Sequence, residues 1–176
     1  MANVNFPHGL RPCMRTESGG FPAVEPYSKA VGYAYAIYQW DPVTLLAGVL
    51  NGPANGITAG TTRYRGVALN WSLASVAATM LIMNQKDAIY EAQDDATGTT
   101  SATNGPGYNA NLTTTAGDST LNRSKVQISA TSIATTSSLD VGLLRLLLDP
   151  TNAYGNYSRF ELMFNKFLTN PEVTQT

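Results

Sequence analysis

Prolines near the start of the chain restrict its fold more than any other feature. Four prolines and three glycines are spread through the first thirty residues, at Pro7, Gly9, Pro12, Gly19, Gly20, Pro22 and Pro26. Proline lacks a backbone donor and fixes φ, so it interrupts helices and is confined to edge strands. The sequence therefore predicts an extended N-terminal arm over residues 1–30, without a helix or a central strand.

The arm carries large apolar side chains that would be poorly hidden if it floated in water. They are Phe6, Leu10, Phe21, Val24 and Tyr27. Exposed apolar groups that gather in one segment are typical of an interaction site. We expect these five residues to contact a surface, either of the chain's own domain or of a neighbouring protein.

Short β-favouring segments separated by turns follow from residue 31. Tyr33, Tyr35 and Ile37 alternate with smaller residues, which predicts a half-buried strand. Further strands are expected at 43–46, 48–50, 63–70, 79–83, 87–93, 124–133, 143–148 and 160–167. The pattern predicts an all-β domain over residues 31–170, with a tail over 171–176. Because the alternation begins only near Val31, we expect this domain to fold without the arm.

Residues 94–120 form a long polar segment inside this domain. They consist almost entirely of Thr, Ser, Asn, Gly, Ala and Asp, with Tyr108 and Leu112 as the large apolar exceptions. Such a composition predicts a polar loop. No Lys or Arg occurs from residue 87 to 122, where the acidic residues are Asp87, Glu91, Asp94, Asp95 and Asp118. This stretch is either a solvated face or a contact patch for a basic neighbour.

Charge and residue counts argue against several function classes. Charged residues make up 13% of the chain and the net charge is -1, which does not suit a nucleic-acid-binding protein. One cysteine, Cys13, and one histidine, His8, cannot build an internal disulfide or a Cys/His zinc site. No phosphate-binding glycine motif or calcium-loop spacing occurs. We therefore expect no cofactor, no metal and no small-molecule substrate.

Catalytic residues are scarce in the sequence. His8 is the one candidate general base of the usual type, and it lies between Pro7 and Gly9 in the arm. Asp94 and Asp95 with Glu91 form the best carboxylate cluster, but adjacent acids in a polar loop are expected to be solvated, with ordinary pKa values. The sequence therefore predicts that the protein is not an enzyme.

Targeting signals are also missing from the sequence pattern. The uncharged stretch 66–85 contains the polar residues Asn70, Ser72, Ser75, Thr79 and Asn84 and does not resemble a spanning helix. Residues 1–10 lack the basic start and continuous apolar region of a signal peptide. We expect synthesis in the cytoplasm and no membrane partner.

Several short motifs occur in an order that is similar to one protein family. They are Gly9-Leu10-Arg11-Pro12, Tyr33–Ile37 leading into Asp41-Pro42-Val43, Arg65-Gly66-Val67-Ala68, Ile89–Asp94, and Leu144-Arg145-Leu146 with Asp149–Asn152 and Gly155. This order resembles the capsid decoration, or cement, proteins of tailed phages, which are similar to the lambda head-decoration protein. The resemblance covers most of the chain.

This resemblance implies a fold, a location and partners. The fold would be a small β-barrel of the β-tulip kind or a β-sandwich. The protein would form a homotrimer, bind the major capsid protein on the outer surface of the virion, and stabilise the shell by bridging neighbouring capsid subunits. The five apolar residues of the arm would then be contacts to the capsid or to a neighbour. The alternatives are a minor head-completion or tail structural protein, a glycan hydrolase of the virion, and a soluble binding barrel.

Overall fold

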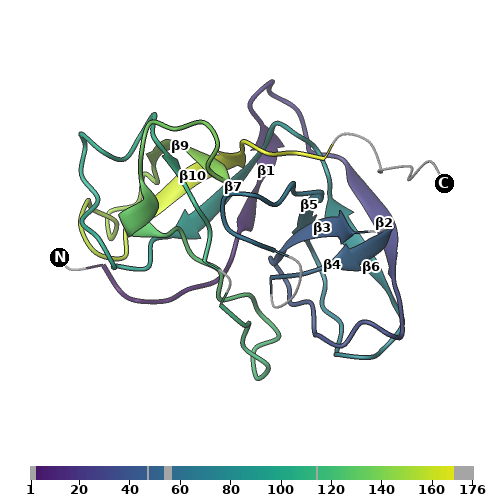
Figure 1. Cartoon of the computed structure of the whole chain (residues 1–176). Helices are drawn as coiled ribbons and strands as arrows, with labels where there is room; N and C mark the ends of the chain where they lie inside the picture. The colour runs from purple at the N-terminus through teal and green to yellow at the C-terminus, as the bar shows by residue number, and fades with distance from the viewer. Residues whose placement is uncertain (1–2, 47, 54–56, 114, 169–176) are drawn as a thin grey trace.

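Two antiparallel sheets of five strands each make up the protein, which confirms the expected all-β class (Figure 1). The computed structural model describes residues 3–46, 48–53, 57–113 and 115–168, so the expected tail over 171–176 lies outside the described residues. The described residues contain no α-helix and a single turn of 3-10 helix, η1 (Ala130–Ser132).

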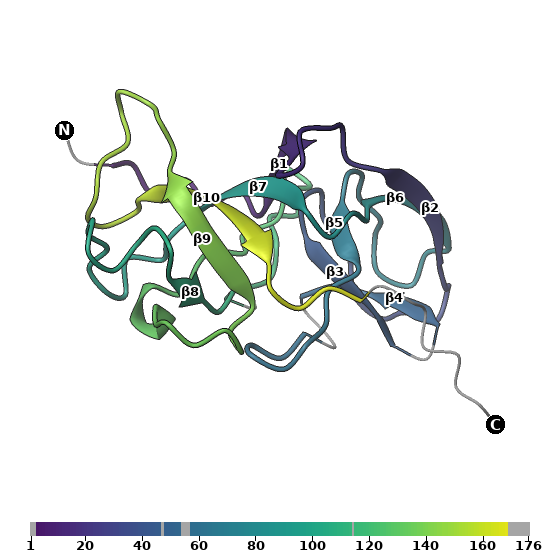
Figure 2. The same ribbon diagram turned by 90° about the horizontal axis from the view of Figure 1, so that it is seen from above.

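The first sheet has the strand order β1-β7-β10-β9-β8. Its strands are β1 (Arg11–Thr16), β7 (Ala88–Gln93), β10 (Arg159–Phe164), β9 (Val141–Leu146) and β8 (Asn109–Ala110). The second sheet has the order β2-β6-β5-β3-β4, formed by β2 (Val24–Lys29), β6 (Ala78–Met83), β5 (Gly66–Ala68), β3 (Pro42–Leu46) and β4 (Val49–Asn51). Both views show the two sheets side by side, joined through the short turn between β6 and β7 (Figure 2).

Both sheets end in free edges, so the described residues do not close a barrel. The β-barrel and β-tulip alternatives of the sequence analysis are therefore not what the described strands form. An all-β domain of the sandwich class agrees with the strand arrangement.

The N-terminal segment supplies one edge strand to each sheet. β1 pairs with β7, with Pro12 opposite Tyr90, and β2 pairs with β6, with Pro26 opposite Leu81. Both strands are edges, as proline requires. The segment is thus extended, but its backbone hydrogen bonds belong to the sheets of the domain.

Two of the expected strands are absent. Residues 33–37 contain one isolated bridge, between Ile37 and Ser72, because no neighbouring strand runs beside them. Residues 124–133 also form isolated bridges instead of a ladder, although Val126, Ile128 and Ala130 are buried as the alternation predicted. The alternation identified the core-facing side chains in 124–133 and, in 33–37, Tyr33 and Ile37 but not Tyr35, which is 42% exposed. The missing partner strand prevented a sheet in both segments.

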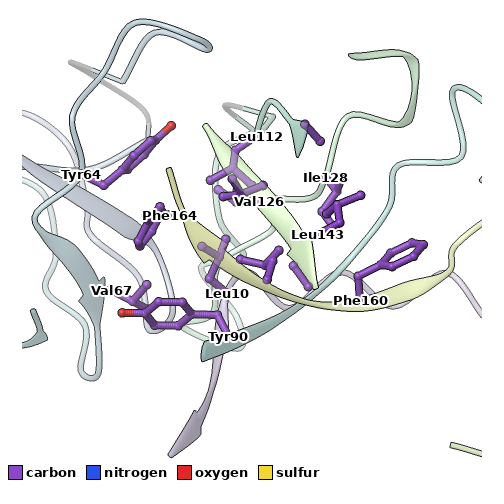
Figure 3. Packing of buried hydrophobic residues seen from close by; sticks show 14 of the residues in the cluster. Leu10, Tyr64, Val67, Tyr90, Leu112, Val126, Ile128, Leu143, Phe160 and Phe164 are labelled. Atoms are coloured by element: carbon purple, nitrogen blue, oxygen red, sulfur yellow. The ribbon is translucent and has the colours of Figure 1, made fainter. Parts of the chain in front are cut away.

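A continuous apolar core lies against the first sheet and reaches the second (Figure 3). Its centre is an aromatic stack in which the rings of Tyr64 and Phe164 lie 4.6 Å apart and nearly parallel. Tyr90 packs on the same Phe164 ring at 5.3 Å. A smaller core under the second sheet is covered by residues 33–37 through Tyr33 and Ile37.

Candidate functional site

The five candidate contact residues of the N-terminal segment lie in different environments. Phe21 is 86% exposed, Phe6 55% and Val24 43%, so these three side chains are open to a partner. Tyr27 is half-buried and stacks with Arg65, whose guanidinium lies 5.4 Å from the ring. Leu10 is fully buried in the main core and contributes to folding instead of to an outer surface.

The acidic stretch, expected to be a solvated face or a contact patch, has two buried acids, Glu91 and Asp94, while Asp87, Asp95 and Asp118 are partly exposed. Asp94 is fully buried, and its carboxylate accepts hydrogen bonds from the backbone N–H groups of Ala96, Tyr157 and Ser158 at 2.8 to 2.9 Å. Burial raises the pKa of Asp94, and these hydrogen bonds oppose the rise. Asp94 therefore ties the start of the polar loop to the turn between β9 and β10.

A cavity of about 490 Å³ lies beneath the N-terminal segment, where Asn3, Val4, Phe6 and His8 line it. Its walls come from the N-terminal segment, from β7, from the start of β10 and from the loops around residues 40, 123 and 151. The lining residues are Asn3, Val4, Phe6, His8, Arg11, Trp40, Glu91, Gln93, Arg123, Thr151, Tyr157 and Arg159. Three arginines and one carboxylate thus face the cavity, beside aromatic and apolar walls.

Hydrogen bonds fix the N-terminal segment as one wall of this cavity. Asn3 donates to the carbonyl oxygens of Ala153 and Asn156 at 2.8 and 2.9 Å. Gln93 accepts from the backbone N–H of Phe6 at 2.9 Å and donates to the carbonyl of Val4 at 2.7 Å. These contacts arise because Gln93 lies at the end of β7, directly below the passing segment.

Glu91 is the electrostatic centre of the cavity wall. The side chain of Arg11 donates to Glu91 Oε2 at 2.6 Å, and Nε2 of His8 lies 3.3 Å from Oε1. Arg159 approaches the same carboxylate at 3.9 Å and also donates to Asp149 at 2.8 Å. Burial alone would raise the pKa of Glu91, but His8 and Arg11 outweigh it and hold the pKa below its usual range.

Arg123 differs from the other two arginines because no carboxylate pairs with it in the part of the chain that the structure describes. Its guanidinium lies 5.0 Å from the ring of Trp40 and 5.9 Å from the ring of Phe6. Its Nε is buried and has no hydrogen-bond partner among the described residues. In the described part of the chain, its recorded contacts are those with the two aromatic rings.

Three arginines give the cavity lining an excess of positive charge. The one hydroxyl among its aliphatic lining side chains, Thr151, already donates to Asp149 at 2.7 Å and accepts from Arg159 at 3.2 Å. No group of three or more metal-ligating side chains occurs in the described ranges.

None of the described helices has the length and apolar character to span a membrane.

Sequence reasoning missed this site because its parts are far apart in the chain. It treated His8 as a tethered residue without chemistry, whereas the structure places it against Glu91 and edge-on to Trp40, with ring centres 6.0 Å apart. Arg123 is the first cation after a long stretch without any. The place of Arg123 in the sequence was the one signal that could have drawn attention to it. It does not reveal which aromatic rings surround the guanidinium.

A second surface feature is an exposed apolar loop held by a buried lysine. The side chains of Trp71, Leu73 and Val76 are 45%, 54% and 46% exposed. The ammonium group of Lys29, a residue that is only 1% exposed, donates to the carbonyls of Leu73 and Val76 at 2.8 and 2.9 Å. Burial lowers the pKa of Lys29. This loop is therefore displayed in a fixed conformation.

Lys29→Met is expected to loosen this loop while keeping the length and apolar part of the side chain. Loss of two charge-assisted hydrogen bonds, partly offset by methionine burial, should lower the free energy of unfolding by about 2 kcal/mol. Urea unfolding measures this change, and limited proteolysis reports whether cleavage begins within residues 70–77. Lys86→Met, at an exposed position, is the control and should change neither.

Comparisons of the chain with protein-family models, with curated proteins and with solved structures find no match.

Proposed function

We propose that this protein is a structural component of a tailed-phage virion, a decoration protein that binds the outer surface of the capsid. In this role it stabilises the shell by bridging neighbouring copies of the major capsid protein. The proposal starts from the order of motifs in the sequence. It is supported by where those motifs lie and by the surface that the domain presents.

Several of the motifs meet in the first sheet. Arg11 of the Gly9–Pro12 motif pairs with Glu91 of the Ile89–Asp94 motif across β1 and β7. Asp94, the last residue of that second motif, binds the backbone of the turn that follows Asp149–Asn152. Residues that are distant in sequence thus depend on one another, which gives a physical reason for their occurrence together.

The observation that carries the proposal is the number of large apolar side chains at the surface of a domain with few charges. Phe21 is 86% exposed, Val4 is 76% exposed, and the Trp71 loop adds a rigid apolar surface. Exposed apolar groups on this scale mark protein contacts. A decoration protein needs such contacts and no catalytic group, because many weak contacts repeated by symmetry hold a shell together.

The proposed assembly is a homotrimer, and light scattering of the purified protein tests it. The alternative is a minor head-completion or tail structural protein, which shares the need for apolar contacts. Stoichiometry separates the two, because a decoration protein is present in many copies per particle and a completion protein in few. A quantitative stained gel of purified particles measures this number directly.

Phe21→Ser is expected to weaken binding to capsid shells that lack the protein by about tenfold or more. Burial of one large apolar side chain at an interface contributes about 1.5 to 3 kcal/mol, and 1.4 kcal/mol corresponds to a factor of ten. Cosedimentation of the purified protein with such shells measures the occupancy. The fold should be unaffected because the Phe21 side chain is almost fully exposed.

Leu148→Ser is the matched control, since Leu148 has the same exposed fraction but lies in the turn after β9 instead of in the N-terminal segment. It should bind shells as the parent does. Equal loss in both variants would show that the N-terminal segment has no special part in attachment. If the parent protein itself does not bind shells, the decoration role is wrong.

A further inference from the structure

We infer that the cavity beneath the N-terminal segment is a binding site for a carboxylate group attached to an apolar or aromatic body. The inference goes beyond the decoration role and does not depend on it. It is carried by three features of the cavity lining: an arginine and a buried histidine nitrogen that have no partner among the described residues, and aromatic walls.

The unpaired arginine supplies the anchor. Among the described residues, Arg11 and Arg159 have carboxylate partners, while the guanidinium of Arg123 touches Phe6 and Trp40 and no acid. Stacking on aromatic rings fixes the plane of a guanidinium and leaves its N–H edge available. A planar guanidinium edge matches the two oxygens of a carboxylate, which makes this pair strong and directional.

The buried histidine is an independent sign of a missing ligand. His8 lines the cavity, its residue is 7% exposed, and its Nδ1 has no hydrogen-bond partner in the described part of the chain. A buried polar atom without a partner costs free energy unless something satisfies it. Nε2 lies 3.3 Å from Glu91 Oε1 without a hydrogen bond among the described residues, so Nδ1, which as an N–H group donates to a carboxylate, is the atom that remains for a bound molecule.

Charge and shape select the kind of anion. The lining holds three arginines and a single acid, Glu91, in a chain whose net charge is -1. These four groups together carry an excess of positive charge, so the lining attracts an anion, and charge alone does not separate a phosphate from a carboxylate. The side chains of Phe6, Trp40 and Tyr157 offer apolar contact that an inorganic anion cannot use. A carboxylate on an apolar body satisfies both parts of the site.

The cavity is large enough and already formed. A volume of about 490 Å³ lies within the range of small-molecule sites, roughly 300 to 1,000 Å³. The hydrogen bonds of Asn3 and Gln93 hold the N-terminal wall in place. Binding therefore requires little ordering of the chain, which favours affinity.

The carboxylate has two possible sources, a free organic acid or an acidic side chain of another polypeptide, and four probes distinguish them. Isothermal titration calorimetry on the full chain uses phenylacetate against its neutral analogue phenylacetamide, and acetyl-Phe-Glu-amide against acetyl-Phe-Gln-amide. We expect each acid to bind at least tenfold more tightly than its amide. Preference for phenylacetate identifies a free acid, and preference for the glutamyl peptide identifies a polypeptide segment.

Variants of Arg123 locate the binding. Arg123→Gln should weaken binding of the preferred acid by about tenfold or more, and Arg123→Lys, which keeps the charge but loses the planar edge, should give an intermediate loss. Arg63→Gln is the matched control, because Arg63 is exposed and does not line the cavity, and it should bind as the parent does.

Circular dichroism of each variant shows whether the fold is kept. If Arg123→Gln does not fold, Phe6→Ala replaces it. This substitution removes one aromatic wall of the cavity, and it should leave the fold intact because the Phe6 side chain is 55% exposed. The inference is overturned if acids and amides bind equally, if no probe binds at 10 mM, or if the folded cavity variants bind as tightly as the parent.

Discussion

Deletion of residues 1–23 is expected to unfold the whole domain. The deletion removes β1, which pairs with β7, and it removes Leu10 from the main core. It also leaves the buried carboxylate of Glu91 without Arg11 and His8. Loss of a buried leucine costs about 2 to 5 kcal/mol, and loss of the partners of a buried charge costs about 3 to 5 kcal/mol more. Together these losses match the typical stability of a domain, about 5 to 15 kcal/mol.

Circular dichroism and thermal unfolding of the truncated chain measure this effect. A cooperative transition and a native β spectrum after the deletion would show that the N-terminal segment is dispensable for folding. Deletion of residues 1–5 is a milder comparison, because it removes the Asn3 contacts but keeps β1 and Leu10. We expect that shorter deletion to leave a folded domain with an altered cavity.

One glycine gives a point test of the same idea. Gly9 has φ of +74°, and a Cβ there would lie 2.3 Å from the Cβ of Ser124 and 2.6 Å from the carbonyl oxygen of Trp40. Gly9→Ala should therefore lower the free energy of unfolding by clearly more than the positive φ alone would cost. Gly19→Ala is the matched control, since its φ is +88° and nothing lies within 4 Å of its Cβ. Thermal unfolding of the two variants separates the clash from the strain.

Local sequence pattern predicted the strands whose partners are near and regular. Phe160, Leu162 and Phe164 alternate into the core, as expected for β10, and Thr79–Met83 lies within β6. The proline argument also holds, since Pro12 and Pro26 both lie in edge strands. In these strands the alternation of apolar residues determines which face is buried. The prolines determine that a strand can pair on only one side.

Pattern alone could not show which apolar segments would find a partner strand. The side chains of Val126 and Ile128 are buried like those of a strand. The backbone around them forms only isolated bridges, in which Ile128 pairs with Asp94 and with Leu112. The N-terminal segment was expected to be separable because its own sequence shows no alternation. Its pairing depends on the free edges of β7 and β6, which are properties of other segments.

The candidate site was less predictable than the fold, because its chemistry depends on contacts across the chain. Asp94 looked like a solvated acid among polar neighbours, but its partners Tyr157 and Ser158 lie more than sixty residues later. Glu91 likewise meets His8 and Arg11 from the other end of the sequence. A polar stretch can be buried when distant backbone donors satisfy it, and no local pattern reports those donors.

Asp41 is expected to make the domain less stable as pH rises from about 4 to about 7. This residue is 2% exposed, Oδ2 of its carboxylate accepts from the backbone N–H of Tyr38 at 2.8 Å, and burial raises its pKa to about 7. Below pH 4 the carboxyl is protonated whether or not the chain is folded. As pH rises, the unfolded chain ionises first and is stabilised, so the free energy of unfolding falls until the folded chain ionises near pH 7.

Asp41→Asn removes this titration while keeping an oxygen that accepts from Tyr38. The parent should lose about 3 kcal/mol of stability relative to the variant between pH 4.5 and pH 8, an order-of-magnitude value from the shift to about 7. Urea unfolding of both chains at several pH values gives the difference directly. Other acids, such as Asp94 and Asp140, are common to both chains, so their contributions cancel.

Asp149→Asn provides a control of opposite sign. Asp149 is exposed to solvent, and hydrogen bonds from Thr151 and then Arg159 lower its pKa to about 2. Its contribution to stability is present above pH 4 and is lost as pH falls towards 2, so this variant should be weakened at neutral pH and not at acidic pH. If the free energies of unfolding of the Asp41 and Asp149 variants differ from that of the parent in the same direction across the pH range, burial does not control the ionisation of Asp41. Opposite departures would show that Asp41, in the turn that leads from Trp40 into β3, is an acid whose ionisation the fold opposes.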